Sequence, residues 1–106
     1  MQEISVQDAA STHADKSDEI ILLDVREDAE LQTAAVAGAL HIPMGQIPDR
    51  LQELDKDRTI LCLCHAGSRS AQVAQYLMAQ GYAKIFNVSG GIDAWSQQVD
   101  PQIPRY

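Results

Sequence analysis

The spacing of apolar residues changes its period at Cys64, and this change limits the possible folds more than any other feature of the chain. Residues 59–63 form a short apolar and partly β-branched run, which is typical of a buried strand. In residues 70–80 the apolar side chains recur at helical spacing instead. Between the two segments, Gly67 permits a positive φ and Ser68 can cap the helix that follows. The sequence therefore predicts a strand, a tight loop and a helix, with a thiol just before the helix.

The predicted loop gives the Cys64 thiol an unusual electrostatic environment. A chain that curls ahead of a helix turns successive backbone N–H groups inward, and such a concave nest favours an anion. A Cys64 thiolate would be stabilised by these groups, by the positive end of the helix and by Arg69, so its pKa should lie below the ordinary value of about 8.5. We therefore expect a nucleophilic Cys64 near neutral pH. The same nest would hold the outer sulfur of a persulfide or the oxygens of a bound oxyanion.

The other cysteine, Cys62, lies inside the apolar run and is predicted to be a core residue. In a strand, residues separated by one position have Cα atoms about 6.6 Å apart and side chains on one face. This separation is near the upper limit for a disulfide, so a bond between Cys62 and Cys64 is not expected. Together with His65 these cysteines match no zinc-binding spacing, and neither a metal nor an organic cofactor is expected.

Several further segments alternate between strand and helix patterns. A continuous apolar run, Ile20–Leu23, ends at Asp24 and is typical of a central strand covered on both faces. Shorter strands are predicted at residues 40–42 and 84–88, with helices at 27–33, at 48–54, after Gly91, and from Ser5 through Ala10 over one sheet edge. This alternation predicts an α/β domain with a mostly parallel sheet. Asp24, Cys64 and residues 89–91 each follow a strand, so they should meet at the carboxyl end of the sheet, where ligands bind.

Four stretches follow one another along the chain: Leu23–Glu27, Gly38–Pro43, Cys64–Ser70 and Val88–Trp95. They span nearly the whole chain, and in this order the chain resembles a single-domain rhodanese, a thiosulfate or persulfide sulfurtransferase. The resemblance implies one rhodanese domain over residues 1–106 with an α/β fold. In that fold a mostly parallel five-stranded sheet is flanked by helices, and the active-site loop lies at the carboxyl end of a central strand.

The resemblance also implies the residues of the active site. Cys64 would be the catalytic nucleophile, and the loop that binds the substrate or the persulfide would be His65, Ala66, Gly67, Ser68 and Arg69. The supporting residues would be Asp24, Arg26 and Ser70. From the residues alone, Asp24 could instead cap a loop and Arg26 could pair with a surface carboxylate. His65 follows the nucleophile directly in a curled loop, so its side chain should point outward and shape the entrance rather than act as a base.

The surroundings of the loop contain four notable positions. Arg69 lies at the positive end of the predicted helix, an unfavourable place for a cation unless an anion offsets it. Many rhodaneses carry a histidine where this chain has Ala35, which affects the packing of that segment but not the nucleophile. Arg58 and Lys84 are candidates for a weakly positive rim that would attract thiosulfate.

The length of the loop bears on the reaction. Four residues separate Cys64 from Arg69, whereas the phosphatases and arsenate reductases of this fold have one more and cradle a tetrahedral oxyanion. The shorter loop favours a single sulfur atom. We expect the Cys64 thiolate to take the outer sulfur of thiosulfate or another persulfide donor and to pass it to cyanide or a thiol. Two alternatives stay open: a persulfide carrier or sulfur-responsive binding module without turnover, and a phosphatase or arsenate reductase.

Composition and charge limit the partners and the location. The net charge of -7 and the lack of any Lys/Arg cluster argue against nucleic acid or an anionic membrane as a partner. No secretory signal or membrane-spanning apolar stretch is visible, so a cytoplasmic location is the expectation. The expected partners are a small sulfur-donor anion, a protein persulfide as a further donor, and a thiol or cyanide as acceptor. The chain is expected to be a monomer or a weak dimer.

Overall fold

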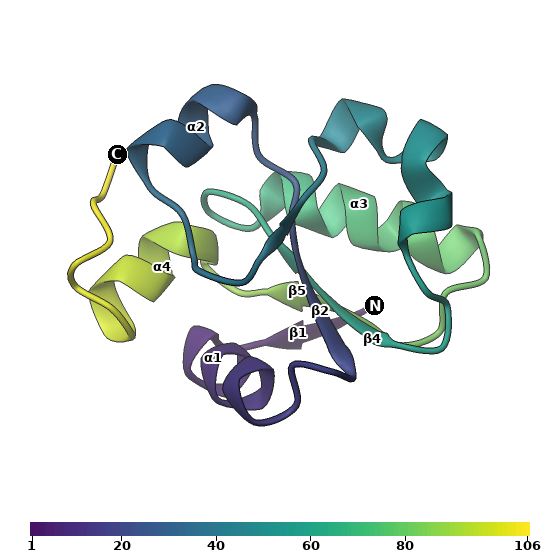
Figure 1. The fold of residues 1–106 in the computed structure, drawn as a ribbon, viewed down its shortest axis with the longest axis horizontal. Coiled ribbons are helices and arrows are strands. Elements are labelled where there is room, and N and C mark those ends of the chain that lie inside the picture. The colour runs from purple at the N-terminus through teal and green to yellow at the C-terminus, as the bar shows by residue number, and fades with distance from the viewer.

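A five-stranded sheet runs through the centre of the molecule (Figure 1). The computed structural model describes all of residues 1–106. Neighbouring strands are all parallel and follow the order β1-β5-β4-β2-β3. The strands are β1 (Gln2–Ile4), β2 (Ile20–Asp24), β3 (Leu40–His41), β4 (Thr59–Leu63) and β5 (Ile85–Val88). The α/β architecture expected from the sequence is confirmed, and β4, which leads into Cys64, is the central strand.

Helices cover both faces of this sheet. The helices are α1 (Val6–Asp15), α2 (Asp28–Thr33), α3 (Ser68–Ala79), α4 (Gly91–Gln98) and two short 3₁₀ helices, η1 (Met44–Gln46) and η2 (Pro48–Glu53). α1 and α4 contact each other and share one core with Trp95 (Figure 1). α3, η1 and η2 pack on the other core, whereas α2 buries no side chain. None of these helices is both long and apolar enough to cross a lipid bilayer.

The strands β2 and β4 carry continuous apolar runs because both of their faces are buried. Successive side chains point to opposite faces, so in β2 Ile21 joins the core beneath α3 and Ile20 joins the core beneath α1 and α4. Cys62 and Cys64 both belong to the core beneath α3, as their two-residue spacing requires. Both are free thiols in this structure.

The N-terminal part of the chain differs from its sequence-based prediction. Residues 2–4 form β1 beside β5, a strand that the sequence did not predict because the segment has no apolar run. Ser5 caps α1 as expected, since its Oγ accepts a hydrogen bond from the Asp8 N–H at 3.1 Å. The helix continues to Asp15, however, and it lies on a face of the sheet rather than over its edge, because Ala9 packs into the core shared with α4.

Two other helix predictions are corrected in detail. Residues 48–53 form the 3₁₀ helix η2 rather than an α-helix, although Pro48 does lie in its first turn. Gly67 adopts a φ of 113° as predicted and is itself the N-cap of α3. Ser68 is therefore the first helical residue, and its side chain makes no capping hydrogen bond. At the other end of α3, Gly81 has a φ of 95°, which agrees with its predicted place just beyond the helix.

Candidate active site

Cys64 lies at the carboxyl end of the central strand, directly after Leu63. The neighbouring strand β2 ends beside it, since Asp24 is the register partner of Leu63. The loop at residues 89–91, which follows β5, reaches the same edge and leads into α4, where the Ile92 N–H donates to the Cys64 carbonyl at 2.9 Å. The three strand ends therefore meet as the sequence predicted. At this edge Cys64 is only 1 % exposed.

The sulfur of Cys64 accepts hydrogen bonds from its own loop. The Gly67 N–H donates at 3.1 Å and the Ser70 hydroxyl donates at 3.2 Å. Burial by itself raises the pKa of this thiol, but the Ser70 hydroxyl and the backbone N–H groups of Ser70, Gly67 and Ala66 outweigh it and hold the pKa of Cys64 below its ordinary value. The thiol therefore ionises more readily than an isolated cysteine, and the thiolate is the nucleophilic form.

A polar network behind Ser70 extends to the first strand. The Ser70 Oγ lies 2.5 Å from Asn87 Oδ1, while Asn87 Nδ2 donates to the Gly67 carbonyl and to Glu3 Oε2, both at 3.1 Å. Glu3 and Asn87 are register partners in β1 and β5. A hydroxyl has one proton, so the Cys64 sulfur and Asn87 Oδ1 compete for it. Sequence reasoning missed this network, and its one signal was a polar residue inside the apolar strand β5.

The turn at Gly90 and Gly91 holds the cysteine loop against α4. Both glycines have a positive φ, 78° and 60° respectively. A Cβ on Gly91 would lie 2.5 Å from the carbonyl oxygen of Cys64 and closer still to that of His65. Only glycine permits such a close approach of the two backbones. The approach lets N–H groups in the first turn of α4 donate to both carbonyl groups, which holds the loop in place.

Arg26 follows the end of β2, and its side chain is fully buried with that of Asp24. Arg26 Nη2 lies 2.7 Å from Asp24 Oδ2, and its remaining N–H groups reach the Ala34 carbonyl at 2.8 Å and the Tyr106 hydroxyl at 2.9 Å. Burial opposes the charge, but the hydrogen bonds with Asp24 and Tyr106 raise the pKa of Arg26. The alternative that Arg26 pairs with a surface carboxylate is wrong, because both members of the pair are buried. Asp24 Oδ1 also accepts the Arg26 backbone N–H at 3.0 Å.

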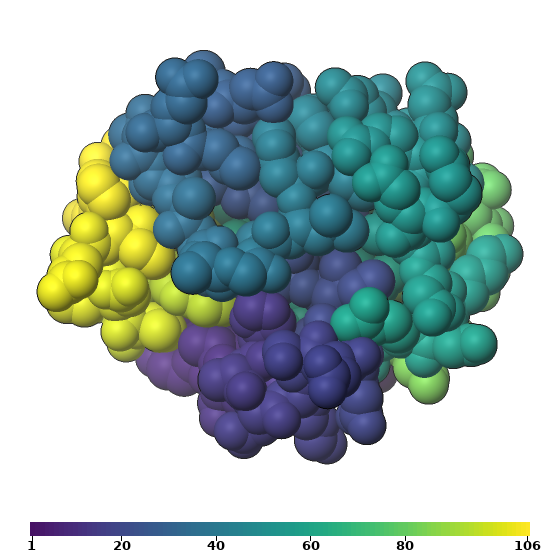
Figure 2. All heavy atoms as spheres, in the orientation of Figure 1, coloured from purple at the N-terminus to yellow at the C-terminus, as the bar shows by residue number.

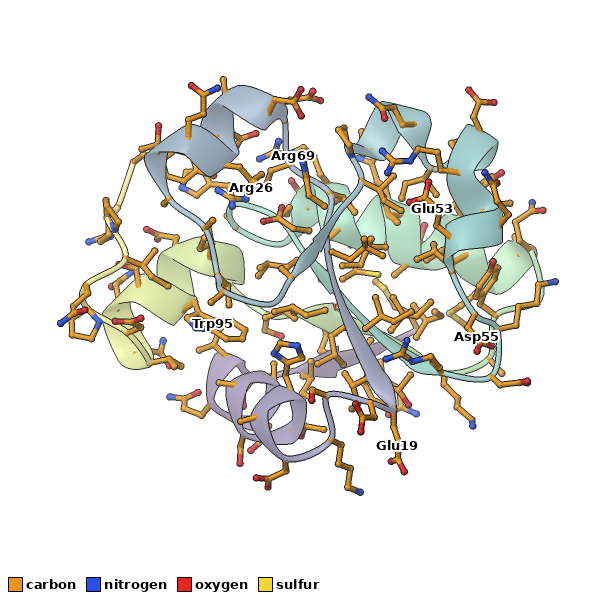
Figure 3. The ribbon with its side chains drawn as sticks, viewed as in Figure 1. Glu19, Arg26, Glu53, Asp55, Arg69 and Trp95 are labelled. Carbon is orange, nitrogen blue, oxygen red and sulfur yellow. The ribbon has the colours of Figure 1, made fainter.

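Arg69 forms an ion pair with Glu30 of α2, with N–O distances of 2.6 and 2.9 Å. Figure 3 shows Arg69 and Arg26 together beneath α2. The hydrogen bonds from Arg69 lower the pKa of Glu30 to about 2, and the same contact raises the pKa of Arg69. The Tyr106 hydroxyl donates to Glu30 Oε2 at 2.6 Å. Glu30 is therefore the anion that offsets Arg69 at the helix start, and the sequence analysis assigned neither Glu30 nor Tyr106 to the site.

The remaining loop residues lie toward the surface. The His65 ring stacks on the Tyr106 ring, with centroids 4.3 Å apart and an angle of 15° between the planes. Ala66 and Ser68 are exposed. Ala35 is exposed as well, so the absence of a histidine at this position leaves no gap in the core.

Arg58 and Lys84 do not form a positive rim around Cys64. They directly precede β4 and β5, so they lie at the amino ends of the strands, across the sheet from the cysteine loop. Arg58 donates at 3.1 Å to the carbonyl of Ser17, in the segment before β2. Figure 3 shows Glu19, which also precedes β2, at this far end of the molecule. The prediction of a rim is wrong because parallel strands place all their amino ends at one edge.

The fold and the site define a class of protein. The rhodanese-like domain family matches residues 6–98. These residues include the whole cysteine loop and the strands β2, β3, β4 and β5, whereas β1 lies before them. The chain therefore belongs to the rhodanese-like domain family.

Named relatives agree with this assignment. A sulfurtransferase of Allochromatium vinosum is 39 % identical over 97 residues, which cover 92 % of this chain and 90 % of the relative. The thiosulfate sulfurtransferase GlpE of Tolumonas auensis is 34 % identical over 92 residues, which cover 87 % of this chain and 85 % of that protein. The crystal structure of a rhodanese-like domain protein from Staphylococcus aureus superposes with a TM-score of 0.84 and 32 % identity, covering 100 % of this chain and 99 % of the other. These similarities support a sulfurtransferase activity.

Proposed function

We propose that the chain moves a sulfane sulfur from thiosulfate or another persulfide donor to cyanide or a thiol, through a persulfide on Cys64. The observation that carries this proposal is the Cys64 sulfur itself, which accepts hydrogen bonds from the Gly67 N–H and the Ser70 hydroxyl at the start of α3. These donors favour an anionic sulfur, both as the attacking thiolate and as the persulfide that replaces it. The relative named thiosulfate sulfurtransferase suggests thiosulfate as a donor.

The reaction has two balanced displacements. In the first, the Cys64 thiolate attacks the outer sulfur of thiosulfate, the S–S bond of thiosulfate breaks, and sulfite leaves with the electron pair. In the second, the acceptor attacks the outer sulfur of the Cys64 persulfide, and the Cys64 thiolate leaves. Cyanide is released as thiocyanate, and a thiol becomes a persulfide. No oxidant or reductant is consumed, because the sulfane sulfur keeps its oxidation state throughout.

Intact-protein mass spectrometry after incubation with thiosulfate tests this proposal directly. We expect the mass of one added sulfur, peptide mapping that places it on Cys64, and its loss with release of thiocyanate after a cyanide chase. The Cys64→Ser variant should gain no sulfur, whereas Cys62→Ser, which changes the thiol two residues earlier, should retain most of the loading. Equal loss in two folded variants would contradict the assignment of Cys64. Hydrolysis of an aryl phosphate would instead favour a phosphatase.

A persulfide carrier without turnover is the second candidate, and two observations favour it. Arg69 is already paired with Glu30, so it offers no free cation to a small anionic donor. The surface pockets lie elsewhere, and none of them is lined by Cys64 or by residues 65–69. A protein persulfide as donor separates the two candidates: a carrier takes sulfur from the protein and shows no turnover with thiosulfate and cyanide.

A further inference from the structure

A chain of charged and polar groups connects the end of β2 to the start of α3, directly after the cysteine loop. It runs from Asp24 through Arg26 to the Tyr106 hydroxyl, then to Glu30, and it ends at Arg69. Each contact that follows the Asp24–Arg26 pair in this chain includes Tyr106 or Glu30 as one of its two partners. Figure 2 shows the C-terminal segment, in yellow, packed against the blue segment that contains α2, which agrees with the Tyr106–Glu30 hydrogen bond.

The ion pair between Glu30 and Arg69 changes the charge that a ligand meets at this loop. Arg69 belongs to the same loop and helix start as Cys64, and the negative charge of a Cys64 thiolate contributes, after Glu30, to the raised pKa of Arg69. Without Glu30, Arg69 would present a full positive charge to an approaching anion. With Glu30 bound in two hydrogen bonds, the net charge of the pair is zero.

We propose that Glu30 is a specificity-determining residue, which neutralises Arg69 and so makes the Cys64 site favour the protonated, uncharged form of an organic persulfide over anionic donors such as thiosulfate. The inference rests on the proposed function for its choice of sulfur donors. The effect of a reagent's charge on its reaction with Cys64 does not rest on that function and can be measured without a sulfur donor. With an organic persulfide, R–S–SH, the Cys64 thiolate attacks the outer sulfur and the S–S bond of the donor breaks. The R–S⁻ thiolate leaves with the electron pair, and the persulfide proton stays on the transferred sulfur.

Alkylation of Cys64 by two reagents of different charge tests the inference without any sulfur donor. Iodoacetate is an anion and iodoacetamide is neutral. Both alkylate the thiolate: a bond forms between the sulfur and the CH₂ carbon of the reagent, and iodide leaves. The ratio of their rates at Cys64, measured by peptide mapping, cancels changes in the intrinsic reactivity of the thiolate. One unit of charge acting over about 7 Å in a water-like medium changes a rate about threefold. Glu30→Gln should therefore raise the iodoacetate-to-iodoacetamide ratio about threefold.

Two control variants distinguish the effect of the Glu30–Arg69 pair from the effect of a change in the net charge of the protein. Asp28→Asn removes one negative charge from the same helix at a strongly exposed side chain, and it should leave the ratio unchanged. The double variant Glu30→Gln with Arg69→Gln should return the ratio to its wild-type value, because both members of the neutral pair are removed together. The gain in Glu30→Gln should also shrink at high salt, since the Arg69 side chain is partly exposed to ions in the solvent.

The sulfur donors provide the second readout. Loading of Cys64 by thiosulfate, a dianion, should increase about ninefold in Glu30→Gln, and loading by methanethiosulfonate, a monoanion, about threefold. An unchanged alkylation ratio in a folded Glu30→Gln protein, or an equal change in Asp28→Asn, would overturn the inference. A changed alkylation ratio with no sulfur loading from any donor would support the charge selection and contradict the proposed function.

Discussion

The two cysteines show how position alone decides the chemistry of a thiol. Cys62 and Cys64 lie on the same face of one strand and its continuation, two residues apart. Burial raises the pKa of Cys62 to about 12. Cys64 is buried as well, but the loop begins there, and the N–H groups and hydroxyl that face its sulfur lower its pKa. A strand interior uses its N–H groups in the sheet, so only a residue at the strand end can collect such donors.

The hydroxyl of Ser70 is the side-chain donor to the Cys64 sulfur, and its removal should shift the ionisation of this thiol. Because the hydrogen bond favours the thiolate, Ser70→Ala should raise the pKa of Cys64, so that the thiolate is lost at a higher pH as the solution is acidified. The pH profile of Cys64 alkylation should move to higher pH, with a rate near neutral pH lower by on the order of tenfold. Ser68→Ala removes an exposed hydroxyl from the same turn and should leave the profile unchanged. Superimposable profiles for Ser70→Ala and wild type would contradict the role of this hydroxyl.

Single residues also show what could be predicted at the site. The position of Cys64 at the end of a strand was predictable, because the change in the spacing of apolar residues is visible in the local sequence. The positive φ of Gly67 was predictable for the same reason, because a tight loop before a helix requires it. The contact of Arg69 with Glu30 was not, since it depends on where α2 comes to lie after β2. Asn87 was missed for a similar reason, because its partner Glu3 lies in an edge strand with no apolar pattern.

At the scale of elements, the cysteine loop and the start of α4 form one backbone unit. Gly91 is the point of closest approach, where a Cβ would meet two carbonyl oxygens of the loop. Gly91→Ala should therefore displace the loop, destabilise the fold by on the order of 2 to 4 kcal/mol and lower the alkylation rate of Cys64. Thermal unfolding and alkylation measure the two effects. Gly45→Ala is the matched control, because a Cβ there meets nothing within 4 Å, and both properties should stay close to wild type.

The strands and helices differed in how well the sequence predicted them. β4 was predicted with its observed bounds, and β2 to within one residue, because strands buried on both faces carry unbroken apolar runs. β1 was missed because it is a three-residue edge strand whose residues are mostly exposed. The edge still matters, since it brings Glu3 to the polar network of the site. Arg58 and Lys84 were misplaced although their positions before β4 and β5 already assigned them to the opposite end of the sheet.

At the scale of the whole molecule, Arg26 links segments that are far apart in the sequence. Its buried side chain joins Asp24 at the end of β2, the Ala34 carbonyl after α2 and the Tyr106 hydroxyl beyond α4. Arg26→Met keeps much of the volume but leaves Asp24 buried without its partner, so it should destabilise the fold by about 3 to 5 kcal/mol. For a chain of this length, thermal unfolding should then show a Tm lower by more than about 10 °C.

The cause of the lower Tm in Arg26→Met can be isolated, because the buried charge of Asp24 can be removed by a second substitution. In the double variant Asp24→Asn with Arg26→Met, the side chain at position 24 is neutral and can still accept the backbone N–H at position 26. This variant should recover a large part of the Tm lost in Arg26→Met, since an unpaired buried carboxylate is the main penalty. Arg50→Met, which breaks the exposed ion pair with Glu53, should have a Tm close to wild type. A double variant no more stable than Arg26→Met would instead mean that the bonds from Arg26 to Ala34 and Tyr106, rather than the charge of Asp24, hold these segments together.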